Sequence, residues 1–244
     1  MILPKREDVF HKIQMYRLLT AILDADTLPK LVYFKGGSCA AMLGFLDRFS
    51  IDLDFDVVKH IPLQKFEREL KEIFRDLDLE VDKKSSRTFF YVLKYQSKPR
   101  LRNSIKLSFI PLEFKSNVYK PLYLTEIDRY AVCQTIETMF SNKLVAVTDR
   151  YKKTKTIAGR DLYDIHHFSL KGYRYNENII EERTGKKPKW YFKELINFIE
   201  EHITQKTIDE DLSFLIQADR FKKIRKLLKK ETLIFLKDEI ERLS

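Results

Sequence analysis

The stretch 35-KGGSCAAMLGFLDRFSIDLDFD-56 carries the most specific pattern in this chain. It opens with a Gly-Gly-Ser turn, continues into an apolar segment, and ends with acids at alternate positions, Asp52, Asp54 and Asp56. The apolar LVYF before it predicts a short buried strand, so the turn joins a strand to a helix. The alternation in IDLDFDVV predicts that a second strand follows.

Around this stretch, the spacing of apolar residues predicts an α+β N-terminal part and a helical C-terminal part. Further strands are expected where β-branched and aromatic residues gather, and strand signals fade after about residue 125. The predicted helices cover 5–26, 38–46, 63–77, 134–152, 160–171, 189–204 and 219–243. The predicted strands cover 31–34, 51–58, 79–84, 88–95 and 104–110. We therefore expect two domains, 1–125 and 126–244.

Composition favours a soluble, globular, cytosolic protein. Hydrophobic residues make up 44% of the 244 residues and charged residues 34%. No run approaches the roughly 18 apolar residues of a membrane span, so no membrane partner is expected. The two cysteines, Cys39 and Cys133, are far apart in sequence and are expected to be free thiols that form no metal pair.

The net charge of +10 is concentrated in residues 83–106, which hold eight Lys or Arg and no acid. The aromatic residues of this segment could stack nucleic-acid bases or face the core of strands, and we favour the core. For the charge we favour a polyanionic partner. The lysines of 222–230 fit a solvated helix face better than a second nucleic-acid surface.

The turn and the acids suggest phosphate and metal chemistry. Glycines allow close approach of a ligand, and a helix start offers unpaired N–H groups, although an ordinary helix cap is the commoner explanation. Asp52 and Asp54 lie two apart on a strand and so face the same side. A solvent-facing acidic edge is the alternative, but Asp is rare inside strands, which favours a pair of Mg²⁺ ions bound with substrate phosphates.

The string FKGGSCAAMLGFLDRFSIDLDF resembles the signature of the DNA polymerase β-type nucleotidyltransferase superfamily, and more narrowly the AbiEii/AbiGii toxin family. That family comprises nucleotidyltransferase-like proteins of abortive-infection and toxin–antitoxin systems. The later string MFSNKLVAVTDRYKKTKTIAGRDLYDIHHF also resembles it, with Lys143, Arg150, Arg160, Asp161 and Asp164 at recurring positions. Together the resemblance spans roughly residues 30 to 170.

The resemblance implies a polymerase β-type lobe with a mixed sheet flanked by helices, followed by a helical-bundle lobe. It implies catalytic roles for four residues and a nucleoside triphosphate substrate. The implied catalytic residues are Asp52, Asp54, Lys143 and Asp161, with Asp52 and Asp54 as Mg²⁺ ligands. The implied nucleotide-binding residues are Lys35, Gly36, Gly37, Ser38, Arg48 and Ser50. Arg160 and Asp164 are expected to fix their helix by ion pairing.

One position departs from the superfamily pattern, which places a third acid on a later strand. Here Ser108 stands at that position, and Glu113 has the wrong parity on a regular strand. Either Asp161 substitutes for the missing acid, or metal binding is weaker than in an active polymerase. The adjacent His166 and His167 are interpreted as structural, with His166 a minor candidate for the cleft, and Trp190 is expected to open a helix and join the core.

We therefore expect a Mg²⁺-dependent nucleotidyltransferase toxin that transfers a nucleoside monophosphate to an acceptor hydroxyl, with tRNA or another RNA as the acceptor and a cognate antitoxin as partner. The alternative is a nucleotide- or RNA-binding module on the same fold that has lost turnover. A third possibility, a small-molecule nucleotidyltransferase, would need an acidic pocket for a cationic substrate, and the basic charge argues against it.

Overall fold

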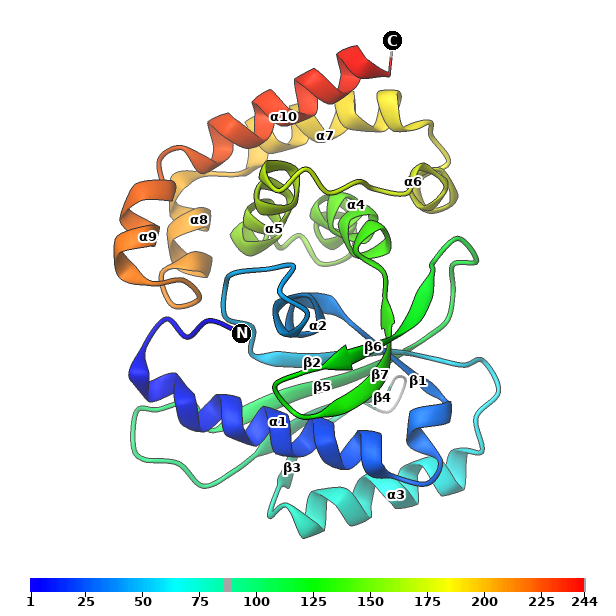
Figure 1. The fold of residues 1–244 in the computed structure, drawn as a ribbon. Coiled ribbons are helices and arrows are strands. Elements are labelled where there is room, and N and C mark those ends of the chain that lie inside the picture. Colours follow the sequence, from blue (N-terminus) through cyan, green and yellow to red (C-terminus); the bar gives the residue numbers. More distant parts are fainter. Residues whose placement is uncertain (86–88, 244) are drawn as a thin grey trace. The chain divides into compact units, whose positions relative to one another are not determined.

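The computed structural model describes residues 1–85 and 89–243 (Figure 1). The chain forms two compact units, of which the first comprises Met1–Lys115 and Tyr119–Gln134 and the second comprises Ser116–Val118 and Thr135–Ser244. Position 88, at the start of an expected strand, and positions 86–88 of the basic segment lie outside the described residues. None of the helices in the described part of the chain combines the length and apolarity that a bilayer crossing needs.

In the first unit, the described residues form one mixed sheet in the order β3-β4-β5-β2-β1-β7-β6. Strand β2 is antiparallel to β1 and parallel to β5, so it lies in the middle of the sheet. The strands are β1 (Val32–Lys35), β2 (Asp52–Val57), β3 (Glu80–Lys84), β4 (Phe89–Lys94), β5 (Ser104–Pro111), β6 (Tyr119–Leu124) and β7 (Arg129–Gln134). The helices of this unit are α1 (Val9–Asp24), α2 (Gly36–Met42) and α3 (Leu63–Asp76), with short 3-10 turns at Arg6–Asp8 and Leu28–Lys30.

The alternation along β2 separates an apolar face from an acidic face. Leu53 and Phe55 are fully buried, and Phe55 stacks on Phe109 of β5 with ring centroids 5.2 Å apart. Phe66 of α3 closes over the same layer, with its ring centroid 5.2 Å from that of Phe109. Helices α1 and α3 lie on this side of the sheet and α2 lies on the other (Figure 1). The core therefore holds β2 rigidly, with its acids on the side of α2.

The second unit is helical, as expected. Its helices are α4 (Ile136–Thr154), α5 (Gly159–Leu170), α6 (Glu177–Thr184), α7 (Pro188–His202), α8 (Gln205–Leu212), α9 (Ala218–Ile224) and α10 (Leu228–Arg242). The single helix expected over 219–243 is in fact two helices. Arg225 follows the end of α9, and its Nε donates to Asp209 of α8 at 2.7 Å. The break allows Leu228 and Leu236 to be buried on α10.

Three other expectations have clear outcomes. Both cysteines are free and buried, and burial together with the neighbouring Cys133 thiol raises the pKa of Cys39. Among the basic-segment aromatics, Tyr91 and Tyr95 are core residues, as favoured, whereas Phe89 and Phe90 are only half-buried. Trp190 does lie in the first turn of α7, but the expectation that it joins the core is wrong: it is 60% exposed, and the Lys193 ammonium lies 4.7 Å from its ring centroid.

Candidate active site

The turn between β1 and α2 requires glycine at two positions. Gly36 has a φ of +78°, and a Cβ atom there would lie 2.9 Å from Oδ2 of Asp54. A Cβ on Gly37 would lie 2.8 Å from both a guanidinium nitrogen of Arg48 and the Ser50 hydroxyl. Such distances are far inside van der Waals contact. The structure thus brings the two glycines, Arg48, Ser50 and one acid of β2 together, all of which the sequence assigned to nucleotide or metal binding.

Ser38 and Arg48 stabilise this turn from inside the unit. Ser38 is 1% exposed, and its hydroxyl donates to the backbone carbonyl of Asp52. Arg48 is 2% exposed, and its Nη1 donates to the carbonyl of Phe49 at 2.9 Å. The Ser38 hydroxyl, expected to be a phosphate donor, is therefore used to tie α2 to the start of β2.

The three acids of β2 have different surroundings. Asp52 and Asp54 are half-buried on the same face, and Oδ1 of Asp54 accepts a hydrogen bond from the Ser108 hydroxyl at 2.5 Å. Asp56 is 5% exposed. It accepts from Lys35 at 2.5 Å, from the Tyr119 hydroxyl at 2.6 Å, and from the Gln134 amide at 2.9 Å.

Asp56 therefore joins β2 to three other strands, β1, β6 and β7, and it is not available to a ligand. The same ion pair places Lys35, one of the residues assigned to nucleotide binding, in a structural contact. Burial of a carboxylate is costly unless its oxygens are matched by donors, and these three side chains supply them. The sequence pattern alone does not distinguish this acid from the two before it.

The donor set on this face fits a magnesium ion that shares its ligands with a nucleotide. Asp52 and Asp54 project together, and Mg²⁺ is usually held by one or two carboxylates, with phosphate oxygens and water completing its shell. Within residues 1–85 and 89–243, no group of three or more His, Cys, Asp or Glu side chains forms a self-sufficient metal site. Glu113 lies beyond the end of β5, so it does not replace Ser108 as a third acid.

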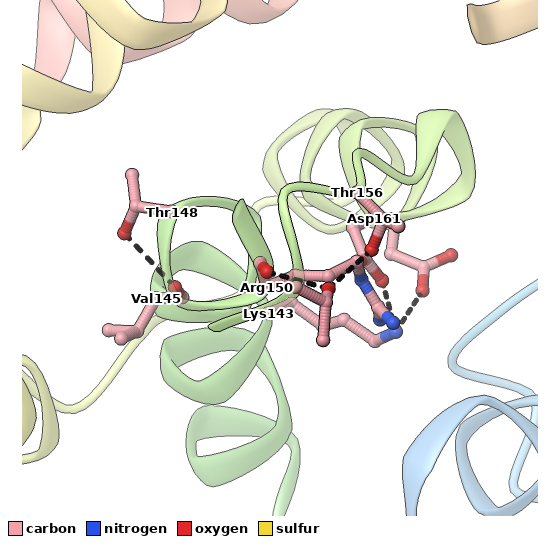
Figure 2. Close-up of polar contacts among 8 residues, drawn as sticks. Lys143, Val145, Thr148, Arg150, Thr156 and Asp161 are labelled. Carbon is pink, nitrogen blue, oxygen red and sulfur yellow. Dashed lines mark hydrogen bonds and ion pairs between the residues drawn. The ribbon is translucent and has the colours of Figure 1, made fainter. Parts of the chain in front are cut away.

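In the second unit, Lys143 of α4 is bound to two acids of α5. Its Nζ lies 2.9 Å from Oδ1 of Asp161 and 2.9 Å from Oδ2 of Asp164. The Arg150 guanidinium lies 3.0 Å from the other oxygen of Asp161. Figure 2 shows both cationic side chains converging on Asp161. Asp164 thus makes the ion pair that the sequence led us to expect.

The carboxylates of this cluster are buried, since Asp161 is 1% and Asp164 0% exposed. Burial alone raises the pKa of Asp161, but the Lys143 and Arg150 cations outweigh it and hold that pKa far below its ordinary value. Asp161 is therefore an anion at any physiological pH. One of its oxygens is bound to Lys143 and the other to Arg150.

The paired histidines are structural, as the sequence suggested. His166 and His167 are each 3% exposed. The Nε2 of His166 lies 2.7 Å from a carboxylate oxygen of Glu231 on α10, which links α5 to α10. Sequence reasoning missed this partner, because Glu231 lies 65 residues further along the chain.

Solved structures similar to this chain come from Helicobacter pylori and Mycobacterium tuberculosis. JHP933 from Helicobacter pylori superposes with a TM-score of 0.62 at 18% identity, covering 99% of this chain and 96% of that one. A protein from H. pylori assigned as a nucleotidyltransferase gives 0.61 at 18% identity, covering 98% and 99%. The toxin MenT4 from Mycobacterium tuberculosis gives 0.48 at 15% identity, covering 97% and 87%. No curated protein matches the chain.

The fold therefore defines the class, an α+β protein with a mixed sheet and a helical second unit, which confirms the expected fold class. The sequence defines the family. Residues 17–236 match the profile of the AbiEii nucleotidyl transferase toxins of type IV toxin–antitoxin systems, and the chain belongs to that family. It is a nucleotidyltransferase of a toxin–antitoxin system, with a nucleoside triphosphate as substrate.

Proposed function

We propose that this toxin transfers a nucleoside monophosphate from a nucleoside triphosphate to an acceptor hydroxyl, in a Mg²⁺-dependent reaction, and that the acceptor is an RNA, with tRNA the first candidate. The acceptor oxygen forms a bond to the α-phosphorus, the bond to the bridging oxygen breaks, and pyrophosphate leaves. The observation that carries this proposal is the close approach of the Gly36–Gly37 turn to Asp54, with Asp52 on the same face.

The residues present would serve that reaction in distinct ways. Asp52 and Asp54 would hold Mg²⁺, which supplies charge neutralisation for the phosphates and for the attacking and leaving oxygens. The glycine turn allows Asp54, Arg48 and Ser50 to lie against the backbone, and its N–H groups would contact the triphosphate. Ser108 holds one oxygen of Asp54 and so orients the carboxylate. Lys143, fixed by Asp161, is proposed to offset the charge of the leaving pyrophosphate.

We also propose a partner, a biological role and a cellular location for the protein. The family suggests a cognate antitoxin as partner, an abortive-infection role and action in the cytoplasm. Growth arrest after induced expression, relieved by Asp52→Asn, would support toxicity that depends on transfer. Equal arrest by both chains would mean that the acid has no part in it.

A direct test uses α-labelled nucleoside triphosphates, Mg²⁺ and total RNA. The wild type is expected to label RNA, and Asp54→Asn to lose label because the anionic ligand is gone. Asp76→Asn, which removes an exposed carboxylate on α3, is the matched control and should keep full transfer. Label transfer by Asp54→Asn at the wild-type rate would overturn the mechanism.

One observation favours a second candidate, a binding module without turnover. Ser108 stands where a third acid is expected, so this face has one negative charge fewer for a metal. In that case neither the wild type nor Asp54→Asn transfers label, while both bind nucleotide or RNA. The label-transfer experiment, combined with a binding assay, distinguishes the nucleotidyltransferase from the binding module.

A further inference from the structure

The acid-bearing face of the sheet continues past β2 onto β5, β4 and β3. Register partners on neighbouring strands place their side chains on the same face. Asp54 is the partner of Ser108 on β5, and their hydrogen bond shows that the two side chains share a face. Ser108 is in turn the partner of Phe90 on β4. Phe90 therefore lies on the face of the acids, two strands away, or about 10 Å at ordinary strand spacing.

Lysines lie on the same face of these strands, two residues along from Asp54, Ser108 and Phe90. Lys106 on β5 is the partner of Asp52 and also of Val92 on β4. Val92 is the partner of Lys83 on β3, next to an irregularity in the pairing. The side chains between these positions point to the other face, where Leu107 is fully buried. One face of these strands therefore carries buried apolar residues, and the other face carries a row of the lysines and Phe90 beside the acids.

The cations of this row are available to a ligand. Lys94 and Lys84, which are nearby, bind local acids: Lys94 lies 2.6 Å from Asp82 and Lys84 lies 2.8 Å from Glu67. Lys83 and Lys106 are exposed, and over residues 1–85 and 89–243 neither has an ion-pair partner. Phe90 is only half-buried, although its chain neighbour Tyr91 is 4% exposed.

We propose that Lys83, Phe90 and Lys106, here called the β3–β5 row, bind the single-stranded 3′ end of the RNA acceptor and present its terminal hydroxyl to the site at Asp52 and Asp54. This inference rests on the proposed function and adds the place and form of the acceptor. The lysines neutralise backbone phosphates, and the half-buried Phe90 ring stacks an unpaired base, the usual combination for single strands.

The row favours a single strand over the other polyanions. Bases inside a duplex are already stacked on one another, so a duplex would leave the Phe90 ring without a base. An acidic peptide would satisfy the two lysines but would also leave the ring unused. The row has both features on the three strands that continue the sheet from β2, which is what a nucleotide chain ending at the reaction site needs.

The first test measures binding directly, by fluorescence anisotropy of a labelled single-stranded RNA of about 12 nucleotides, within the usual site size for such proteins. Phe90→Ala is expected to weaken binding by about 5-fold or more, and Phe90→Tyr to retain it. Phe10→Ala, which truncates a 41% exposed ring on α1 across the sheet, is the control and should change nothing. Equal affinities for Phe90→Ala and the wild type would overturn the role of the ring.

The second test measures salt dependence. The double variant Lys83→Gln/Lys106→Gln is expected to reduce the slope of log K against log salt by about 1.4, from roughly 0.7 for each phosphate contact on a single strand. Lys65→Gln/Lys71→Gln, which removes the same charge from exposed positions of α3, should leave the slope unchanged. Slopes that fall equally in both pairs would mean a general charge effect and would refute the row.

Two further arms decide the form of the ligand. A duplex of the same sequence, or polyglutamate, that binds as tightly as the single strand and depends equally on the row would overturn the single-stranded assignment. The assays contain no nucleoside triphosphate and no Mg²⁺, so they do not depend on turnover. If RNA binding depends on the β3–β5 row but no label is transferred, the proposed transfer reaction is refuted and this inference stands. If label is transferred but RNA binding does not depend on the row, this inference is refuted and the reaction stands.

Discussion

The stability of the first unit should fall in mild acid because of one buried histidine. His11 of α1 is 2% exposed, and its Nε2 lies 3.1 Å from the carbonyl of Ile51, which can only accept, so Nε2 carries the proton. The Tyr95 hydroxyl lies 2.6 Å from Nδ1 and donates to the carbonyl of Arg102 at 2.9 Å. Burial is the main cause that lowers the pKa of His11 from 6.5 to about 4. The bond to the Ile51 carbonyl raises this pKa, and the Arg102 cation, which is paired with Asp8, lowers it.

The size of the effect follows from linkage. Because the folded pKa lies below the unfolded one, the unfolded chain takes up the proton first as the pH falls, and the free energy of unfolding decreases. With values of 6.5 and about 4, the loss between about pH 7 and about pH 5 is roughly 2 kcal/mol. Most of it occurs above the range in which ordinary carboxylates titrate.

The assay is urea unfolding at several pH values, followed by hydrogen exchange of peptides from α1 and β2. Fluorescence of the only tryptophan, Trp190, reports on the second unit and serves as an internal reference. His11→Gln retains an N–H donor for Ile51 and does not titrate, so its free energy of unfolding should change about 2 kcal/mol less over this range. Parallel pH profiles for wild type and variant would show that His11 is not the cause.

Three shorter predictions concern the site. Gly36→Ala should destabilise the first unit and abolish transfer. The control is Gly44→Ala, where φ is +77° and no atom lies within 4 Å of the added Cβ, so urea unfolding should show only the backbone strain of about 1–2 kcal/mol. Equal transfer activities of the two variants would refute the steric argument. Lys143→Met should destabilise the second unit by about 3 kcal/mol, measured by tryptophan fluorescence, because it leaves buried Asp161 short of a cation; an unchanged midpoint would contradict this. Asp56→Asn should lower the melting temperature of the first unit, and a variant that melts normally but fails to bind Mg²⁺ would instead make Asp56 a ligand.

The strand–turn–helix–strand order and the shared face of Asp52 and Asp54 follow from the sequence because both depend on local rules. Glycine is favoured where φ is positive, and strand side chains alternate. The structural role of Asp56 does not follow, since its partners Lys35, Tyr119 and Gln134 come from three other strands. Periodicity shows which way a side chain points but not what it meets.

The unexpected strands have a similar explanation. The segment YKPLYL contains Pro121, which lacks an N–H group and weakens a strand prediction, yet β6 lies at the edge of the sheet, where proline is tolerated. Strand β7 follows directly and is only six residues long. Trp190 was misplaced because its helix buries Tyr191 and Phe192 instead, a choice between adjacent aromatics that periodicity alone did not resolve.

The pairing of β1 with β7 has a consequence for synthesis of the chain. Phe34 on β1 lies beside Cys133 on β7, so β1 lacks this neighbour until about a hundred residues more have left the ribosome. Until then β1 is an open edge that can pair with another nascent chain. The sheet of this toxin is complete only after β7 has been synthesised, so the protein would be inactive during most of its own translation. Fragments that end before Gln134 should aggregate and should not be toxic.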